Sequence, residues 1–599
     1  MLRPWSILVL AFLFACGDEE ASPRPTDDVE PGPSAGPAEK VRIGPLANAG
    51  PDQRALPGMV VRLDARGTIP PEDGRPFRHR WLQEAGPRVH LSDPTAPVVE
   101  FVAPPIRPGD ADRLVFRLTV DDGNFRSTDR VAVELVEDAA ELASAPAAVG
   151  GADIEVRPGE EVEIPPPAFA DPACALAEDP EACLAEPLPF CWTQVTGPRV
   201  EIEGACGETP TRFLAPAREG VLVFRLDAHA RGLHEPAACG PEALVPIESP
   251  LCGAPDYLRV VVRATPRRSG SLPTAWLRVL AEERPRVALI PLGGTAASIP
   301  TEVDVVAGGS DPERWRLFPR FRPVIGRLVA NQDANSLRLG APSWPGPVGV
   351  AYDPWFYHHL AQGGQVRLEW LRAAPSLAVL HWLPPSDTPP LQAELGDRPC
   401  GAASPEGSCE PLTPGEEVVL VGRMEGGGVQ GCWDQTHGPR VDLVPSSRCT
   451  ADNAERRFVA PAPAGGAPLE LAFQFTVRDA GPYESRPATL WLQVRPEDVF
   501  PPQVVLDPAP RLAPGTSTEL DASGSVDPHG GMLAFRWRQV AGPPLGVRGC
   551  DDLPEEACVV VTAPLDAVGR AEFELEVASQ ATRLITRRRF AIEIAEETP

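Results

Sequence analysis

Thirteen cysteines are the residues whose chemistry this sequence shows most clearly. Cys16 stands alone near the start of the chain, and the other twelve fall into groups of six, four and two. Even groups favour disulfide bonds, because pairing leaves no thiol over. A zinc site would instead need close pairs such as Cys-x-x-Cys with matching ligands, and the sequence has no such pair.

The spacing of the twelve cysteines predicts which of them pair. The groups of six and four share a pattern, since each has two cysteines nine residues apart and another directly before a tryptophan. The predicted bonds are Cys174–Cys183, Cys191–Cys206, Cys239–Cys252, Cys400–Cys409, Cys432–Cys449 and Cys550–Cys558. Because disulfides persist in oxidising compartments, we expect the folded part in a space such as the periplasm or on the cell surface.

Sequence motifs for catalysis are absent from this chain. It has no His-Glu-x-x-His, no Gly-x-Ser-x-Gly, no phosphate loop and no dinucleotide fingerprint. The nine histidines are scattered, and only His358 and His359 are adjacent. We therefore predict a protein that is not an enzyme and that has no catalytic residues, no cofactor and no metal site.

The adjacent histidines lie in a segment rich in aromatic residues. Trp344, Trp355 and Tyr357 are its candidate binding residues, because exposed rings can stack on sugar faces or hold partner side chains. The alternative is that the same rings fill the core of a folded domain. The sequence leaves both interpretations open.

Two clusters of acidic and amide residues have the hard oxygen atoms that calcium prefers. They are Asp121-Asp122-Gly123-Asn124 and Asp527-Pro528-His529. Turn chemistry explains the same residues, since Asp and Asn side chains hydrogen-bond to the backbone of tight turns. We favour the turn interpretation.

A repeated motif indicates the elements that must position these residues. Trp-x-Gln-x-x-Gly-Pro occurs four times, beginning at Trp81, Trp192, Trp433 and Trp537. Each copy is followed by an Ala-Pro and then by a strand with alternating hydrophobic residues. Alternation with a period of two is typical of a strand with one buried face. We expect the four tryptophans to lie in the cores of small two-sheet domains.

The intervals between the four tryptophans are 111, 241 and 104 residues. The middle interval is about two repeats long, so a fifth unit without the motif, or an inserted domain of another kind, is expected within it. The predicted organisation is a signal peptide at 1–15, a disordered tether at 16–40, and domains at 41–138, 150–265, 271–380, 381–497 and 499–595.

The repeat resembles the PKD (polycystic kidney disease) domain and its bacterial relatives. The resemblance is carried by Ala47-Asn-Ala-Gly-Pro-Asp-Gln53, by Leu520-Asp-Ala-Ser-Gly-Ser-Val-Asp-Pro528 and by the tryptophan motif with its Ala-Pro and following strand. It implies an all-β fold of tandem immunoglobulin-like (PKD-like) β-sandwiches. It also implies extracellular modules that serve adhesion, spacing or ligand contact.

The first sixteen residues resemble a bacterial lipoprotein signal peptide. Arg3 is followed by an apolar stretch from Trp5 to Ala15 and then by Cys16. The resemblance implies that Cys16 is lipidated and becomes the mature N-terminus; an ordinary cleaved signal peptide is the alternative. Eleven apolar residues cannot cross a hydrocarbon core of about 30 Å. Residues 16–40, rich in Pro, Gly and acids, are expected to be disordered.

The charge balance restricts the class of partner. With 55 basic and 83 acidic residues the net charge is −28, which disfavours nucleic acid because phosphate binding needs a basic face. We expect a protein anchored by its N-terminal lipid in the bacterial outer membrane, facing the periplasm or the cell surface, whose modules bind an unknown protein or carbohydrate. The alternatives are a purely structural spacer and an accessory protein of a secreted hydrolase with its function in residues 271–380.

Overall fold

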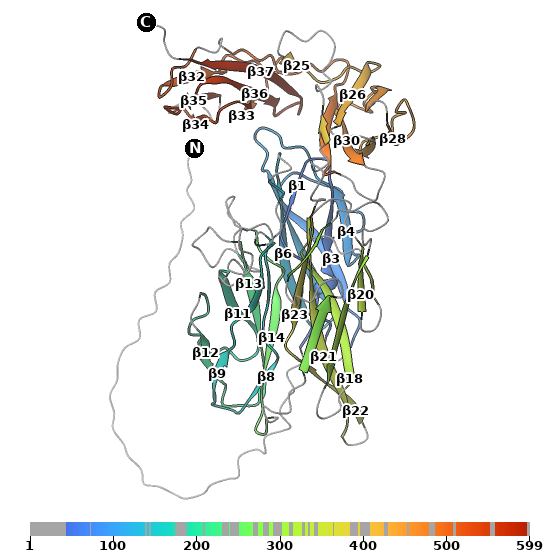
Figure 1. Cartoon of the computed structure of the whole chain (residues 1–599), viewed down its shortest axis with the longest axis vertical. Helices are drawn as coiled ribbons and strands as arrows, with labels where there is room; N and C mark the ends of the chain where they lie inside the picture. The colour runs from blue at the N-terminus through green and yellow to red at the C-terminus, as the bar shows by residue number, and fades with distance from the viewer. Residues whose placement is uncertain are drawn as a thin grey trace, which may run out of the picture. The chain divides into compact units, whose positions relative to one another are not determined.

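Strands form almost all the regular structure of the protein in this computed structural model (Figure 1). Among the described residues, the single helical element is the 3-10 turn η1 (Ala65–Gly67). The 75 prolines account for this, because proline inside a helix removes a hydrogen bond and clashes with the preceding turn. The described residues are 43–595 without 72–73, 138–140, 143–144, 173, 175–187, 208–209, 231–238, 240–250, 267–273, 280–286, 292–301, 311–315, 326–329, 333–335, 341–345, 363–364, 384–392, 396–407, 425–428, 452–453, 479–484, 507–510 and 551–556.

The first six strands form sandwich 1. One sheet has the order β1-β6-β5-β3 and the other pairs β2 with β4. The short β1 runs parallel to β6, whereas the other pairs are antiparallel. This arrangement of two facing sheets is that of an immunoglobulin-like sandwich. The strands are β1 (Gln53–Ala55), β2 (Val60–Asp64), β3 (Arg78–Ala85), β4 (Val98–Val102), β5 (Arg113–Asp121) and β6 (Arg126–Leu135).

Sandwich 2 repeats this order. Its larger sheet is β11-β13-β14-β8 with β8 parallel to β14, and its smaller sheet pairs β9 with β12. A further pair, β7 and β10, lies outside these two sheets. The strands are β7 (Ala147–Val149), β8 (Ile154–Val156), β9 (Glu161–Ile164), β10 (Ala168–Ala170), β11 (Phe190–Thr196), β12 (Thr211–Leu214), β13 (Gly220–Ala228) and β14 (Asp256–Val262).

Sandwich 3 lacks the tryptophan motif but keeps the same strand order. Its larger sheet is β16-β23-β21-β18, with β22 paired to β21, and β16 is again parallel to β23. The other sheet is β15-β17-β20-β19. The strands are β15 (Thr274–Val279), β16 (Val287–Pro291), β17 (Glu302–Ser310), β18 (Arg316–Ile325), β19 (Ala330–Gln332), β20 (Ser336–Gly340), β21 (Gly346–Gln362), β22 (Gln365–Arg372) and β23 (Ser376–Leu383).

Sandwich 4 has the sheets β28-β27-β30-β31 and β24-β26-β29. Sandwich 5 has the sheets β37-β36-β33 and β32-β35-β34. Strand β25, which comes just before β26 of sandwich 4 in the chain, pairs with β37 and so extends the first of these two sheets. In both sandwiches a single parallel β-bridge takes the place of the short parallel strand. Leu412 pairs with Val494 in sandwich 4, and Leu512 pairs with Ile594 in sandwich 5. The strands are β24 (Ala393–Leu395), β25 (Ser408–Cys409), β26 (Glu417–Met424), β27 (Gln430–His437), β28 (Cys449–Thr450), β29 (Glu455–Val459), β30 (Leu469–Arg478), β31 (Ala488–Val494), β32 (Ser517–Asp521), β33 (Leu533–Ala541), β34 (Gly546–Gly549), β35 (Cys558–Thr562), β36 (Gly569–Ser579) and β37 (Ile585–Ile594).

Three of the four motif tryptophans lie in the cores as expected. Trp81, Trp192 and Trp433 are 2%, 3% and 3% exposed. The indole N–H of Trp81 donates to the carbonyl of Ala96 at 3.1 Å, which satisfies the polar end of the buried ring. Trp537 is only partly buried, at the border of two hydrophobic clusters of sandwich 5.

The glutamine of the motif shapes the turn that follows each tryptophan. In all four copies its side-chain amide donates to the carbonyl of the motif proline, over 2.7 Å from Gln83, Gln194 and Gln435 and 2.6 Å from Gln539. Its side-chain oxygen accepts the N–H six residues further on, for example that of Val441 at 3.0 Å. The ladder shifts register directly after this glutamine, so the motif encodes a β-bulge.

The glycine of the motif is required by backbone geometry. Its φ lies between 85° and 94° in the four copies, in the left-handed region that side chains other than hydrogen disfavour. A Cβ atom on Gly438 would also collide with the carbonyl oxygen of Glu470 on the neighbouring strand. The motif therefore combines a buried ring, a turn-forming amide and a close backbone approach.

We expect Gly438→Ala to lower the free energy of unfolding of sandwich 4 by about 2 kcal/mol or more, because it adds backbone strain to a collision. The matched control is Gly466→Ala in the same sandwich, where an added Cβ meets no atom within 4 Å, and we expect an effect within about 0.5 kcal/mol. Chemical denaturation of the two variants measures the difference. Equal midpoints would contradict the role assigned to this glycine.

Candidate functional site

Four of the six predicted disulfides are present among the described residues. Cys191–Cys206, Cys239–Cys252, Cys432–Cys449 and Cys550–Cys558 are bonded as expected. Cys174 and Cys409 are also disulfide-bonded, and their predicted partners, Cys183 and Cys400, lie outside the described residues. Cys16 lies outside them too.

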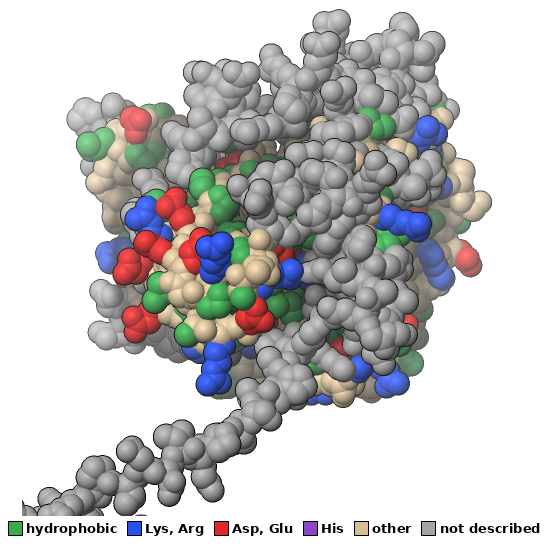
Figure 2. Space-filling model, turned by 90° about the horizontal axis from the view of Figure 1, so that it is seen from below, with side chains coloured by type: hydrophobic (Ala, Val, Ile, Leu, Met, Phe, Trp, Pro, Cys, Tyr) green, Lys and Arg blue, Asp and Glu red, His purple; other side chains and the backbone are tan. Residues whose placement is uncertain are grey.

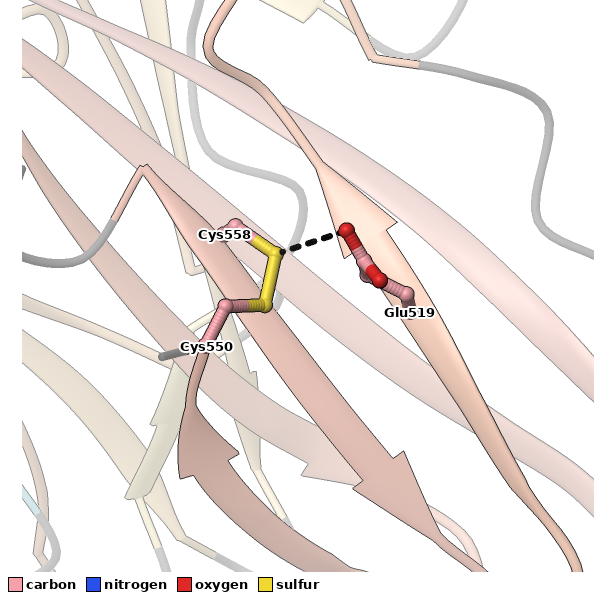
Figure 3. A group of neighbouring side chains, drawn as sticks. All are labelled: Glu519, Cys550 and Cys558. Atoms are coloured by element: carbon pink, nitrogen blue, oxygen red, sulfur yellow. Dashed lines mark hydrogen bonds between the residues drawn. A yellow bond between two sulfur atoms is a disulfide. The ribbon is translucent and has the colours of Figure 1, made fainter. Parts of the chain in front are cut away.

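One group of side chains in the described part of the chain has the composition of a metal site. The sulfur atoms of Cys550 and Cys558 and a carboxylate oxygen of Glu519 lie within 4.8 Å of one another in sandwich 5 (Figure 3). The two sulfurs are bonded to each other, however, so neither is the thiolate that binds a metal. In this oxidised form the group is a disulfide that closes the loop before β35, beside a carboxylate.

The aromatic residues of sandwich 3 do not form an exposed platform around Trp355. This ring is only 9% exposed, and the guanidinium of Arg259 from sandwich 2 lies over it, 5.0 Å from the ring centroid. Tyr357 is half-buried, and Trp344 lies outside the described residues. The expectation that Trp355 could receive a ligand is wrong for this arrangement, because a neighbouring sandwich occupies its face.

The acidic clusters considered for calcium are used within turns. Asp122 accepts the N–H groups of Asn124 and Phe125 at 2.8 and 2.7 Å. Asp527 accepts the N–H of His529 at 2.9 Å and the hydroxyl of Ser579 at 2.7 Å. These contacts are those of turns stabilised by a carboxylate, as favoured from the sequence.

The hairpin β13–β14 of sandwich 2 is buried on both faces. Its inward residues, such as Phe224 and Leu258, are 0% exposed, but so is Val223 on the opposite face. The alternation of hydrophobic residues in β13 predicted one buried face, which the structure confirms, but the structure buries the other face as well. The second face is covered because sandwiches 1 and 3 contact it, and its charged residues are therefore buried as well.

Sandwich 1 contacts this outer face through one buried arginine. Arg225 on β13 is 4% exposed and pairs with Asp129 of β6 at 2.7 Å and with Asp227 at 2.8 Å. Beside it, the hydroxyl of Tyr257 donates to the carbonyl of Ala47 at 2.5 Å. The strands of sandwiches 1 and 2 are thus joined by a charged group that is almost fully buried.

Burial also perturbs Asp52 at the same junction. Its carboxylate accepts the N–H of Ala132 at 2.7 Å and that of Cys252, in sandwich 2, at 3.0 Å. Burial raises the pKa of Asp52 to about 6, against the lowering effect of these two hydrogen bonds. A cavity of about 30 Å³ adjoins it, lined also by Arg113 and Arg225.

Sandwich 3 contacts the same hairpin through a larger ionic cluster. Arg372 of β22 donates to Asp256 of β14 at 2.8 Å, to the carbonyl of Tyr257 at 2.6 Å and to Asp353 of β21 at 2.5 Å. Arg322 of β18 bridges the same two carboxylates at 2.8 and 2.7 Å. All of these ionic side chains are at most 4% exposed.

A second pair extends this cluster. Arg259 of β14 donates to Asp153 at 2.5 Å, and Asp153 also accepts the backbone N–H of Arg372 at 2.9 Å. Apolar side chains flank the ions, with Ala147, Val149 and Ala170 of sandwich 2 packed against Val324, Ala351 and Leu377 of sandwich 3. We call the ion pairs of Arg225, Arg259, Arg322 and Arg372 with their aspartates the junction cluster.

The pKa shifts in the junction cluster follow from mutual pairing. Burial works to raise the pKa of Asp353, but Arg322, Arg372 and Arg320 together hold it well below its ordinary value. Burial works to lower the pKa of Arg372, and Asp256 and Asp353 outweigh that effect. Pairing therefore favours the charged forms of Asp353 and Arg372, whereas burial raises the pKa of Asp227.

Sequence reasoning did not identify the junction cluster. Arg225 and Asp227 alternate with core residues in β13, which is also the pattern of a solvated strand face. On the part of the surface shown in Figure 2, described acidic and basic side chains are interspersed, as such strand faces are when solvated. Only the contact with another sandwich distinguishes the buried charges from exposed ones.

Comparison with known proteins gives no family for this chain. No family model matches it, and no curated protein matches it. Solved structures align weakly: immunoglobulin domains 1–5 of Sidekick-1, at 11% identity and a TM-score of 0.14, cover 93% of this chain and 99% of theirs. The human desmocollin-1 ectodomain, at 9% identity and a TM-score of 0.15, covers 92% of this chain and 99% of its own.

A third aligned structure is a nucleoside hydrolase-related hypothetical protein from Saccharophagus degradans that is associated with carbohydrate metabolism. It is 20% identical with a TM-score of 0.14, and the alignment covers 16% of this chain and 26% of that one. Because these alignments are weak, the immunoglobulin-like architecture rests on the strand order described above.

Among the described residues, no helix combines the length and apolar character needed to cross a membrane.

We expect Arg372→Met to lower the free energy of unfolding by about 3–5 kcal/mol, because it leaves buried carboxylates without a full counter-charge. The control is Arg212→Met, which removes an exposed pair with Glu163 at 2.8 Å and should cost at most about 1 kcal/mol. Chemical denaturation followed by tryptophan fluorescence compares the two variants. Similar losses in both would refute the structural role of the junction cluster.

Proposed function

We propose that this protein is a non-catalytic, lipid-anchored component of a bacterial cell envelope whose tandem sandwiches form a binding or adhesion scaffold. Lipidation of Cys16 would hold the chain at the outer membrane, facing the periplasm or the cell surface. The sandwiches would then present their free surfaces to a protein or carbohydrate partner.

The observation that carries this proposal is the junction cluster. An independent string of modules would leave the outer faces of its sheets in water, whereas β13 and β14 bury charged side chains between three sandwiches. Buried ion pairs tolerate little displacement, because each ion loses its hydration and depends on its partner. Modules joined in this way would hold surfaces from different sandwiches in fixed relative positions, as a binding scaffold requires.

The polar groups of sandwich 3 support a non-enzymatic role. A hydrolase accessory domain would need convergent polar groups that are free to meet a substrate. The described buried charged groups of this sandwich, Arg322, Asp353 and Arg372, are instead paired with each other and with Asp256. Their pairing favours a structural role for the segment that was the candidate home of an enzymatic function.

The anchor is tested with Cys16→Ala in a Gram-negative host. We expect the unaltered chain in the membrane fraction with an incorporated fatty-acid label, and the variant without that label, because the acylated sulfur is missing. Ser22→Ala, in the predicted tether, is the control that should keep both the label and the membrane location. An unchanged label in the Cys16 variant would contradict lipidation at this residue.

The binding role is tested separately with the mature chain on arrays of bacterial polysaccharides and envelope proteins. A scaffold that binds should retain at least one partner class in a saturable manner. A purely structural spacer should retain none, and that result would overturn the binding role while leaving the anchor in place.

A further inference from the structure

A groove with features of a ligand site lies where sandwiches 1, 4 and 5 meet. Its volume is about 760 Å³, within the about 300–1,000 Å³ that small-molecule sites usually have. Seven of its lining residues are aromatic or basic: Arg88, His90, Phe101, Arg107, His437, Trp491 and Arg583. We call it the Trp491 groove.

The walls of the groove are held together by contacts between sandwiches. The side-chain amide of Gln474 in sandwich 4 donates to the carbonyl of Gly58 in sandwich 1 at 3.0 Å. Arg107 forms an ion pair with Glu470, and Arg583 of sandwich 5 pairs with Asp110 of sandwich 1 at 2.7 Å. Three sandwiches thus contribute walls to the groove, and side-chain contacts join them.

An apolar platform forms one side of the groove. Trp491 on β31 is half-buried and lies beside His437, with 5.0 Å between the ring centroids and 44° between the ring planes. Flat rings of this kind pack against the apolar face of a sugar while polar groups around them bind its hydroxyls. The carboxylates of Glu100 and Glu470, which also line the groove, are suitable acceptors for such hydroxyls.

Donors in the groove lack acceptors. The indole N–H of Trp491 and the Nε–H of Arg107 are buried and have no hydrogen-bond partner among the described residues. Leaving such groups unpaired costs free energy. Arg88 is exposed, and no acidic side chain of the described residues pairs with it; its described contact is with the carbonyl of Gln83 at 3.3 Å.

Three arginines line the groove in a chain of net charge −28, and two of them have carboxylate partners, Arg107 with Glu470 and Arg583 with Asp110. Burial lowers the pKa of Arg107 to about 10, and repulsion from Arg583 adds to that effect. Burial and Arg107 likewise lower the pKa of His437. Burial is the larger cause of both shifts and the neighbouring arginine the smaller one, and an anionic ligand would relieve that smaller repulsion.

We propose that the Trp491 groove binds an acidic oligosaccharide, with a sugar ring on Trp491 and its carboxylate at Arg88. This inference deepens the proposed function, on which it rests, by naming the ligand class and the site. The rings, the unpaired donors and the unpaired arginine together fit a polyhydroxylated anion better than a bare ion, which would not use the platform.

The test is isothermal titration of the mature chain with a trisaccharide of galacturonic acid and with a neutral trisaccharide of galactose. We expect the acidic sugar to bind about tenfold more tightly, because it adds charge-assisted hydrogen bonds to arginine. Trp491→Ala should weaken binding about tenfold, whereas Trp491→Phe, which keeps a ring, should retain most of it. Thermal unfolding of both variants shows whether the fold is intact.

Arg88→Gln has a matched control in the same motif. Arg199 occupies the equivalent position in sandwich 2, donates to the carbonyl of Gln194 at 3.1 Å and lies outside the groove. We expect Arg88→Gln to reduce the preference for the acidic sugar and Arg199→Gln to leave it unchanged. Equal binding of both sugars, equal effects of the two arginine variants, or equally tight binding of an oligoglutamate peptide would overturn the proposal.

The outcome also separates this inference from the proposed function. If the groove variants leave binding to another array partner unchanged and the galacturonic trisaccharide does not bind, the groove assignment is wrong and the scaffold role stands. If the array retains no partner and the trisaccharide does not bind, both are wrong.

Discussion

The burial of charge on the outer face of β13 and β14 is the constraint on which the arrangement of sandwiches 1, 2 and 3 depends. Transfer of an ion out of water costs several kcal/mol even after relaxation, and pairing offsets that cost only when the geometry is good. Arg225 and Arg372 each pair with one carboxylate of their own sandwich and with one of another, Asp129 and Asp256 respectively. Arg259 pairs with Asp153 within sandwich 2. We interpret the junction cluster as the feature that makes one arrangement of these sandwiches more favourable than others.

The individual sandwiches are built on a different principle. Within each of the four that carry the motif, a tryptophan fills or borders the core, a glutamine side chain closes the turn and a glycine permits close approach of two strands. These are local interactions, repeated with nearly the same distances. Sandwich 3 has the same strand order without the motif, so the motif stabilises this fold without being necessary for it.

This difference explains how much of the structure could be predicted from the sequence. The tryptophan cores and four of the disulfides follow from local spacing, and the structure confirms them for Trp81, Trp192 and Trp433. The junction cluster could not be predicted, because Arg372 and Asp256 are 116 residues apart and no local period links them. For the same reason the sequence singled out Trp355, which a neighbouring sandwich covers, and passed over Trp491, which lines a groove.

The junction cluster should couple the unfolding of sandwiches 2 and 3, so that the backbone hydrogen bonds of both open in the same event. Hydrogen exchange of the full chain, measured by mass spectrometry, tests this coupling most directly, because amides of β14 (Asp256–Val262) and β21 (Gly346–Gln362) report on the two sides of the joint. We expect peptides from both strands to exchange with the same opening free energy, and we expect Asp353→Asn to lower that free energy in both strands. Independent exchange of the two strands, with a response to the variant in β21 alone, would contradict this coupling.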